Sequence, residues 1–205
     1  MARPGTTPVC RDTALCAHLH DVDVTVDAGP DVWAHNIEVV RRLTRSIRDV
    51  RCSYDQSLGV LRHVKDRAPK AITKSSIMVG IGETDGEVVE TMRDLRSAGV
   101  DVLTIGQYLR PTPKHAAVER YVPPATFDAF AAEGKDMGFA FVASGPLVRS
   151  SYKAAEVFVR AVLCPGDTAA ADALLQERMA TAKAHGLSGL APAASLLPVH
   201  ALVRR

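Results

Sequence analysis

The residues of this chain that could do chemistry gather where short apolar runs end. Four such ends are polar or rich in glycine, and they read His35-Asn36, Gly82-Glu83, Gly106-Gln107-Tyr108 and Ser144-Gly145-Pro146. Amide, carboxylate and hydroxyl groups can bind a polar ligand, and glycine lets the backbone approach it closely. Turn chemistry alone would also place Asn, Gly and Ser at such ends. These positions therefore predict a ligand-binding edge without identifying the ligand.

The four cysteines, at positions 10, 16, 52 and 164, are not spaced like a metal-binding motif, and no CxxC or CxxxCxxC occurs. Iron–sulfur clusters are held chiefly by cysteine thiolates at such spacings. Cys10 and Cys16, followed by His18 and His20, are the one grouping with the residue types of a metal site. We interpret that grouping as part of a polar, disordered segment. Cys52 and Cys164 are interpreted as reduced thiols that fill space.

Apolar periodicity and capping signals predict which elements position the four polar ends. Ser53 with Gln56, and Thr84 with Glu87, have the spacing of a capping box and predict two helix starts. Gly99 is expected to end the second of these helices. Strands are expected at residues 31–34, 74–80, 100–105 and 139–142, and further helices from Ile37 to Ile47 and over 124–137.

Strands and helices that alternate in this way predict a parallel sheet with right-handed crossovers, hence an α/β fold. Periodicity alone leaves open a doubly wound sheet or a (β/α) barrel. In both, ligands bind outside the carboxyl ends of the strands. The four polar ends are thereby predicted to share one edge.

Composition indicates a globular protein and argues against two classes of partner. Apolar residues make up 47% of the 205 residues, charged residues 23%, and the net charge is +2 without a basic stripe. We therefore expect no nucleic-acid partner. No run of about 18 apolar residues occurs and the N-terminus has no apolar core, so we expect no membrane span or secretory signal and a cytoplasmic location.

Four segments, taken together and in order, resemble lipoyl synthase, a radical S-adenosylmethionine enzyme. They are VDAGPDVWAHNIEVVRRL from Val26, SYDQSLGVLRHVK from Ser53, the stretch from Thr73 that begins TKSSIMVGIGETDGE and includes TIGQYLRPTPKH, and MGFAFVASGPLVRSSY ending at Tyr152. The resemblance covers the C-terminal two-thirds of the barrel of that family. It implies a partial (β/α) barrel of radical-S-adenosylmethionine type whose N-terminal strands are missing.

The resemblance also implies a domain plan and a reaction. Residues 1–22 are expected to be a divergent, disordered segment, 23–152 the partial barrel, and 153–205 a divergent helical and flexible extension. The family inserts two sulfur atoms at C6 and C8 of a protein-bound octanoyl group. Its cofactors are S-adenosylmethionine and two 4Fe–4S clusters, one of which is consumed as the sulfur source. Its partners are octanoylated lipoyl carrier domains, namely the E2 components of 2-oxoacid dehydrogenases and the glycine-cleavage H protein.

Carried over residue by residue, the resemblance assigns cofactor-binding roles to Asn36, Lys74, Glu83, Gln107 and Arg149. It makes Ser151, the second serine of RSSY, an oxygen ligand to one iron of the sulfur-donating cluster. His115 would lie in the substrate-facing loop. Each residue also has a simpler interpretation. Asn36 would satisfy a turn, Lys74 would be a solvated strand-start charge, Glu83 would complement a helix dipole, and the serines would cap a helix over 153–163.

The cysteine motifs of the family, CxxxCxxC and Cx4Cx5C, are absent from these residues. No catalytic residue is therefore assigned, and this polypeptide alone is expected neither to assemble a cluster nor to cleave S-adenosylmethionine. The alternative is a non-catalytic remnant or paralogue that binds S-adenosylmethionine or a lipoyl carrier domain. A third hypothesis, an unrelated phosphate-binding barrel, has little support because GIGETDG is too weak a glycine-rich loop.

Overall fold

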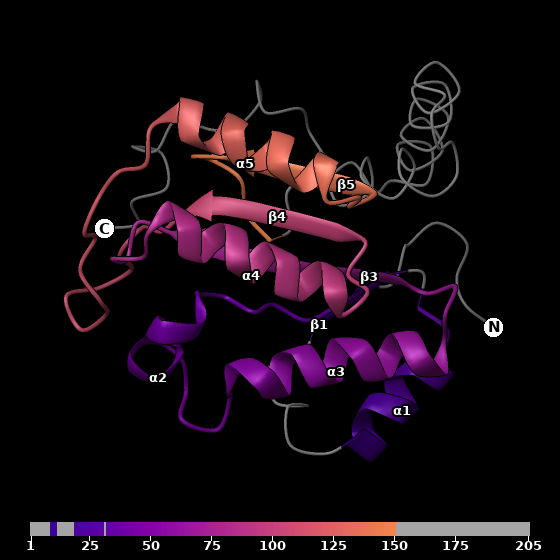
Figure 1. Ribbon diagram of the computed structural model, residues 1–205. Coiled ribbons are helices and arrows are strands. Elements are labelled where there is room, and N and C mark those ends of the chain that lie inside the picture. The colour runs from indigo at the N-terminus through magenta and orange to yellow at the C-terminus, as the bar shows by residue number, and fades with distance from the viewer. Residues whose placement is uncertain (1–8, 12–18, 31, 151–205) are drawn as a thin grey trace, which may run out of the picture.

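The computed structural model describes residues 9–11, 19–30 and 32–150, and these residues form one parallel sheet covered by helices (Figure 1). The sheet has five strands in sequence order: β1 (Val9–Arg11), β2 (Val32–Ala34), β3 (Ile72–Val79), β4 (Val102–Gln107) and β5 (Phe141–Gly145). All four neighbouring pairs are parallel. The α/β class and the parallel sheet predicted from the alternation are confirmed.

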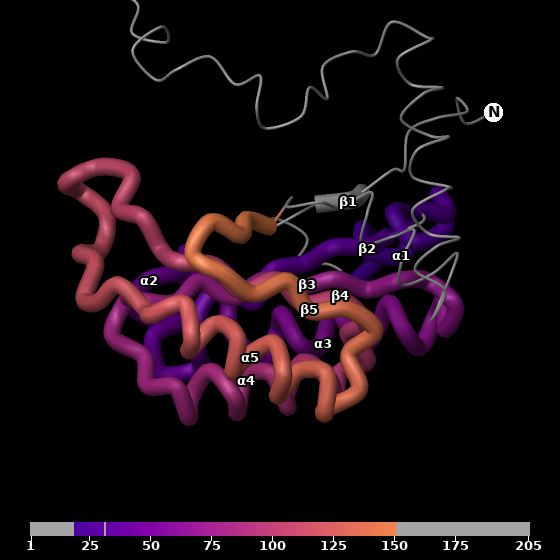
Figure 2. Tube along the Cα trace, turned by 90° about the horizontal axis from the view of Figure 1, so that it is seen from above, coloured from indigo at the N-terminus to yellow at the C-terminus, as the bar shows by residue number. Residues whose placement is uncertain are grey.

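The helices between these strands are α1 (Leu19–Asp27), the 3-10 turn η2 (Arg41–Leu43), α2 (Thr44–Ile47), α3 (Tyr54–Arg67), α4 (Asp85–Ser97) and α5 (Pro124–Asp136). Figure 2 shows α3, α4 and α5 together on one face of the sheet. Strands that add one after another in the same direction, each followed by a helix on the same face, produce this arrangement. The carboxyl ends of all the strands consequently meet at one edge.

Local sequence signals fix the starts of two crossover helices, α3 and α4. The Ser53 hydroxyl accepts a hydrogen bond from the Gln56 backbone N–H, and the Gln56 side chain accepts one from the Ser53 backbone N–H. Thr84 and Glu87 form the same reciprocal pair at the start of α4. Gly99, with a φ of 83°, follows the C-cap of α4 in the left-handed conformation that glycine adopts without steric cost. Both predicted capping boxes and the predicted stop are confirmed.

The main core lies between the sheet and the three long helices. Its fully buried members include Leu61 of α3, Met92 and Leu95 of α4, and Phe127 of α5. The sheet contributes Trp33, Ile77, Val79, Leu103 and Ile105 to the same cluster. Removing apolar side chains from water in this layer is the dominant stabilising contribution to such a fold.

Of residues 1–22, the structure describes 9–11, which form β1 and pair with β2, and 19–22, which open α1. A hydrogen bond of 2.7 Å between His63 Nε2 and Asp23 Oδ1 joins α3 to α1. The expected division of the chain at residues 22 and 152 stays a prediction. The predicted helix from Ile37 is wrong at its start, because residues 37–40 are not helical and helical structure begins only at Arg41. The expected helix over 153–163 and the tail beyond it lie outside the described residues.

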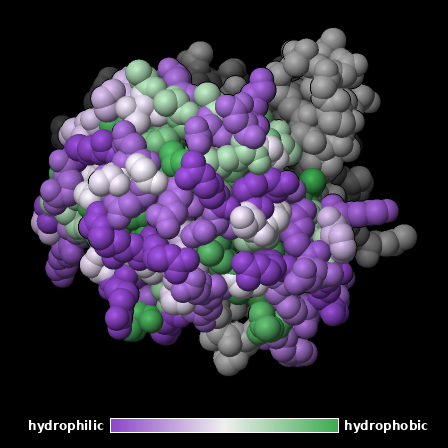
Figure 3. Space-filling view, in the orientation of Figure 1, coloured by the Kyte–Doolittle hydropathy of each residue, from purple (hydrophilic) through white to green (hydrophobic). Residues whose placement is uncertain are grey.

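The helical side of the molecule presents a largely hydrophilic surface, on which hydrophobic residues appear singly (Figure 3). Exposed large hydrophobic residues in the described ranges include Val50, Leu147 and Tyr121. Within those ranges no helix combines the length and the apolar character needed to cross a bilayer.

The capping carboxylate of Glu87 gives a testable pH dependence. The Arg42 guanidinium donates to both of its oxygens, at 2.7 and 3.0 Å, and with the Thr84 backbone N–H it lowers the pKa of Glu87 to about 2. Because the pKa of Glu87 is lower in the folded than in the unfolded protein, the ionised carboxylate contributes to the free energy of unfolding above its unfolded-state pKa. That contribution is lost as the pH falls toward 2. We expect Glu87→Gln to lower the free energy of unfolding by about 1 kcal/mol at pH 7 and by less at pH 2.5, as measured by urea unfolding at both pH values. An equal cost at both would contradict the assignment, and Glu90→Gln, on an exposed position of the same helix, is the control.

Candidate site at the carboxyl edge of the sheet

The two faces of the sheet differ in chemistry. Ile77, Val79, Leu103 and Ile105 enter the helix-facing core, so the alternate residues of β3 and β4 face the other way. We call this opposite side the inner face; the residues of β3 and β4 on it are Ile72, Lys74, Ser76, Met78, Val102, Thr104 and Gly106. Three of these seven residues, Lys74, Ser76 and Thr104, carry a polar side chain, whereas a covered parallel sheet is usually apolar. A polar inner face that meets the carboxyl edge is suited to a polar ligand rather than to another apolar layer.

Asn36 lies just past the end of β2, in a segment that bulges away from regular pairing. Its side-chain amide donates to Glu38 Oε1 at 3.0 Å. Glu38 has a φ of 68°, the one left-handed non-glycine among the described residues, and its backbone pairs with β3 at Ser76 and Met78. Strained backbone of this kind costs on the order of 1–3 kcal/mol and is concentrated at functional sites. Asn36 is half buried, so its amide lies at the predicted edge.

Glu83 holds the loop that follows β3. Its side chain is only 1% exposed, and its two oxygens accept hydrogen bonds from the backbone N–H groups of Gly80 at 2.7 Å and Ile81 at 2.9 Å. The Arg120 guanidinium lies 3.6 Å away and is bound more closely by Asp85, whose hydrogen bond raises the pKa of Arg120. A buried carboxylate with these partners fixes loop geometry.

Gln107 ties the end of β4 to the long loop that precedes α5. Its Nε2 donates to the carbonyl oxygens of Tyr108 and Arg120, and its Oε1 accepts a hydrogen bond from the Val122 N–H at 2.9 Å. Because Gln107 pairs with Val79 in register, its side chain lies on the helix-facing side. A Cβ at Gly80 would lie 2.2 Å from Nε2, so the amide occupies the space that this glycine leaves.

The turn after β5 folds back over the inner face. Figure 2 shows this segment on the side of the sheet opposite α3, α4 and α5. It passes close to Gly106, where an added Cβ would lie 2.1 Å from the Val148 carbonyl oxygen. Arg149 Nη1 donates to the carbonyl oxygens of Val148 at 2.7 Å and Gln107 at 3.3 Å. Lys74 Nζ then donates to the Ser150 carbonyl oxygen at 2.6 Å.

Of the residues expected at the site, Lys74, Gln107 and Arg149 are connected through this turn, whereas Asn36 and Glu83 hold the ends of β2 and β3 separately. Lys74 is 3% exposed, which excludes its interpretation as a solvated strand-start charge. Ser151 lies outside the described residues. His115 lies on the exposed loop after β4, where its Nδ1 is 2.9 Å from the Thr112 hydroxyl oxygen.

Two residues that shape this edge, Glu38 and Arg120, are not predicted from the sequence, whereas Gly106 is predicted at the edge but without its partner Val148. Glu38 is part of the HNIE segment, but nothing in its residue type signals a left-handed backbone. Gly106 follows an apolar run, and a glycine inside a strand often marks close backbone approach, which agrees with its contact with the turn after β5. Arg120 has no local signal, because its partners Glu83 and Asp85 are distant in the sequence.

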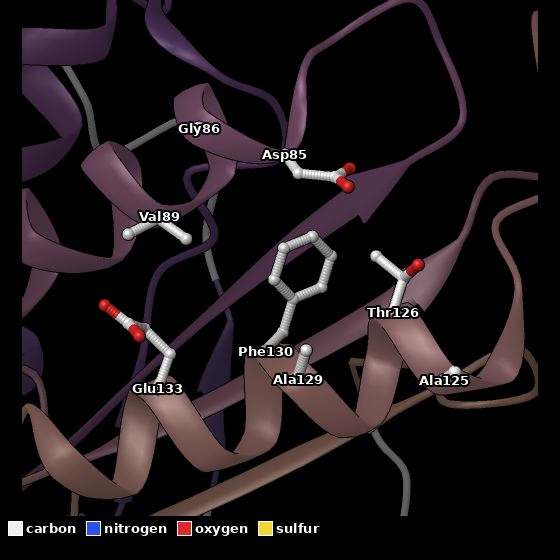
Figure 4. Close-up of a pocket in the computed structure, with 8 residues that line it drawn as sticks. All are labelled: Asp85, Gly86, Val89, Ala125, Thr126, Ala129, Phe130 and Glu133. Carbon is white, nitrogen blue, oxygen red and sulfur yellow. The ribbon is translucent and has the colours of Figure 1, made fainter.

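A pocket of about 420 Å³ opens on the other side of the sheet, between α4 and α5 (Figure 4). Phe130 lies between the two helices, with the carboxylates of Asp85 and Glu133 toward opposite ends of the groove. None of the residues expected at the site lines it. The described ranges also contain no group of three His, Cys, Asp or Glu side chains arranged to hold a metal. The inner face is therefore the better candidate for chemistry.

Comparison with known proteins identifies close relatives. The chain is 59% identical over 188 residues to "Lipoyl synthase" of Sorangium cellulosum, covering 81% of this chain and 50% of that protein. It is 50% identical over 161 residues to "Lipoyl synthase, chloroplastic" of Arabidopsis thaliana, covering 78% of this chain and 41% of that protein. The chain thus spans about half the length of the curated relatives it matches.

No family model matches the chain. Among solved structures, hydroxymethylglutaryl-CoA lyase from Pseudomonas aeruginosa matches over 86% of this chain and 77% of its own length, at 14% identity and a TM-score of 0.40.

Proposed function

This chain is a partial lipoyl synthase sequence, and we propose on that basis that it supplies the C-terminal strands of a radical S-adenosylmethionine barrel acting in lipoate biosynthesis. The observation that carries the proposal is identity of 50–59% with named lipoyl synthases over about four-fifths of the chain. Within the proposal, the whole enzyme inserts sulfur at C6 and C8 of an octanoyl group on a lipoyl carrier domain.

The architecture supports a barrel rather than a doubly wound sheet. Strand order follows the sequence without reversal from β1 to β5, and the three long helices lie on one face. A doubly wound sheet reverses its order and carries helices on both faces. A polar inner face then becomes the wall of a barrel interior, and further strands would extend the sheet at an edge.

The donor groups present fit S-adenosylmethionine in part. Asn36 can both donate to and accept from a zwitterionic ligand, and the hydroxyl groups of Ser76 and Thr104 lie on the inner face. We propose that these groups contact the ligand directly. Glu83 and Gln107 would act through the loops that they hold, and Arg149 through the turn. When bound with a reduced cluster, S-adenosylmethionine supplies the radical that removes hydrogen from unactivated carbon.

The residues present do not fit an iron–sulfur cluster. Neither cysteine motif occurs in the 205 residues, and a single serine oxygen at Ser151 cannot hold four irons. Within the proposal, the cysteine ligands of both clusters therefore come from polypeptide other than residues 1–205. The role left to this chain is to hold the ligand and the turn that leads to Ser151.

Iron analysis tests the proposal directly. After anaerobic reconstitution, residues 1–205 alone are expected to retain less than about half an iron per chain. Co-reconstitution with the N-terminal half of a lipoyl synthase, including both cysteine motifs, is expected to raise the complex to about eight irons, since two four-iron clusters form. The control is the same N-terminal half alone. About four irons per chain on residues 1–205 alone would contradict the proposal.

The absent cysteines favour one alternative, a non-catalytic protein that binds S-adenosylmethionine or a lipoyl carrier domain. Titration calorimetry with S-adenosylmethionine separates the two functions when it is read beside the iron analysis. Binding by the chain alone, with no gain of iron on mixing, supports the alternative. Gain of iron and of thiolated octanoyl-carrier product on mixing supports the synthase.

A further inference from the structure

We propose that the rim of the carboxyl edge is a docking surface for an acidic protein domain. The rim is defined as residues 41–51, which contain η2 and α2, together with residues 109–122, the loop between β4 and α5. The identity of the acidic domain rests on the proposed function, within which it is the carrier of the octanoyl group. The surface itself is argued from charge, exposure and packing of the described residues.

The two rim segments lie at the end of the sheet where the ligand edge is. Figure 1 shows α2 and the loop before α5 at the end toward which the β4 arrow points. Both segments pack against one small cluster of buried side chains, formed by Val39, Ile81 and Tyr108. Ligands of parallel (β/α) folds bind at this end. A protein that delivers a group to this edge therefore meets the rim.

The rim is far more basic than the rest of the chain. Residues 41–51 contain five Arg and one Asp, a net charge of +4, and residues 109–122 contain two Arg, one Lys and one Glu, a net charge of +2. The rim thus carries +6, whereas the whole chain carries +2, so the remaining residues together carry −4. Positive charge gathered on one part of a surface attracts and orients an acidic partner.

Half of the rim cations keep their charge available to a partner. Four are paired with a carboxylate of this chain, namely Arg41, Arg42, Arg51 and Arg120. The other four have no carboxylate partner within the described ranges, and they are Arg45, Arg48, Arg110 and Lys114. Arg48 donates to the Ser57 hydroxyl oxygen at 2.8 Å and Arg110 to a backbone carbonyl oxygen, which leaves both charges without a counter-charge. Arg45 and Lys114 are exposed.

Exposed apolar side chains lie among these cations. Of the six exposed large hydrophobic residues in the described ranges, three belong to the rim: Val50, Leu109 and Tyr121. Val50 is 98% exposed, so its side chain makes almost no contact within the chain. Apolar and aromatic side chains that become buried at the centre of a contact, with charged groups around them, are the usual composition of a protein interface.

This mixture favours a protein over other polyanions. A nucleic acid is bound by a continuous basic stripe. At the rim the cations are instead interrupted by apolar side chains and by the carboxylates of Asp49 and Glu119. An acidic domain with apolar side chains of its own would match both features.

Titration calorimetry with a charge-reversal variant tests the basic part of the rim. The probe is an octanoylated lipoyl carrier domain of net negative charge, added to residues 1–205. We expect binding at about 50 mM salt that weakens by about tenfold at about 300 mM, because salt screens exposed charges. Arg45→Glu combined with Lys114→Glu should weaken binding at low salt by about tenfold or more. Neither side chain has a described partner to lose, so the fold should be retained.

The control makes the same change in net charge outside the rim. Arg62→Glu combined with Lys70→Glu alters two exposed cations, one on α3 and one just before β3. This variant should weaken binding by less than about threefold. Equal weakening by the two double variants would show that net charge alone acts, and the proposal would then be overturned.

Val50→Ser tests the apolar part of the rim. It should weaken binding by about fivefold at both salt concentrations, because an apolar contact is not screened. Val24→Ser, which alters an exposed valine of α1, is the control and should leave binding unchanged. Wild-type affinity in Val50→Ser would remove the apolar contact from the proposal and contradict a mixed docking surface.

Competing polyanions are tested in the same way. The probes are a single-stranded RNA of about 20 nucleotides and vesicles with about one-third phosphatidylserine. Binding of either probe through Arg45 and Lys114, without binding of the carrier domain, would overturn the proposal. A dissociation constant above about 1 mM for the carrier domain and the wild-type chain would also overturn it.

Failure of the proposed function gives a different pattern of results. If clusters assemble with the N-terminal half but the rim variants bind the carrier domain like wild type, the synthase proposal stands and the docking surface is overturned. If no cluster assembles but the chain binds the carrier domain through the rim, the synthase proposal fails and the docking surface stands. The iron analysis and the titration therefore decide the two proposals separately.

Discussion

Gly106→Ala is expected to lose about 3 kcal/mol of unfolding free energy and to displace the turn after β5. The added Cβ would lie 2.1 Å from the carbonyl oxygen of Val148 and 3.1 Å from its carbonyl carbon. Both are backbone atoms, so no flexible side chain can move aside. The turn must lift from β4, and the contacts of Arg149 and Lys74 with the turn would lengthen. Urea unfolding measures the loss, and exchange of 145–150 measures the displacement.

Gly59→Ala is a matched control for this substitution. Gly59 lies within α3, where a Cβ added to it would have no atom within 4 Å. Alanine there should stabilise the protein by about 0.5–1 kcal/mol, because glycine is unfavourable in a helix interior. A Gly106→Ala protein with wild-type stability and wild-type exchange would show that the turn is not seated on β4.

Glu83→Gln is expected to lower the free energy of unfolding by about 3 kcal/mol, because the buried NH2 group of the new side chain would face a backbone N–H donor. The amide oxygen can accept a hydrogen bond from one of the two backbone N–H groups that now donate to the carboxylate. Its NH2 group would point at the other, and the ion pair with Arg120 would be lost. The loop after β3 should loosen, which exchange of residues 79–84 would report beside urea unfolding.

Glu119→Gln is the control, because Glu119 is exposed and lies on the neighbouring loop. It should change the stability by less than about 0.5 kcal/mol. The two roles of Glu83 predict different results. Full stability of Glu83→Gln combined with lost S-adenosylmethionine binding would show a direct contact with the ligand. A loss of stability supports the loop-holding role.

The parts of the fold that were predictable are those with local causes. A capping box needs residues three positions apart, so Ser53 with Gln56 and Thr84 with Glu87 were visible in the sequence. Alternation of apolar runs and helical periods was enough for the parallel sheet. The four polar ends were predicted to share an edge for the same reason, since parallel strands end together.

The parts that were missed depend on distant partners. Ile37 and Val40 have helical spacing, but pairing of Glu38 with β3 keeps residues 37–40 out of a helix. Gln107 ends a strand as predicted, yet its amide is turned toward the loop at Arg120 and Val122. Neither partner can be read from neighbouring residues. Residue type and place were therefore predictable, whereas the direction of each side chain was not.

The turn over the inner face has a consequence for how two polypeptides would join. Contacts from Lys74, Gly106, Gln107 and Arg149 seat this turn on the strands of its own chain. The conformational entropy of ordering the turn is thus lost when the chain folds, before any encounter with a second half. A partner that brought the cysteines would meet a preorganised surface, and its binding free energy would not be reduced by ordering the segment that leads to Ser151.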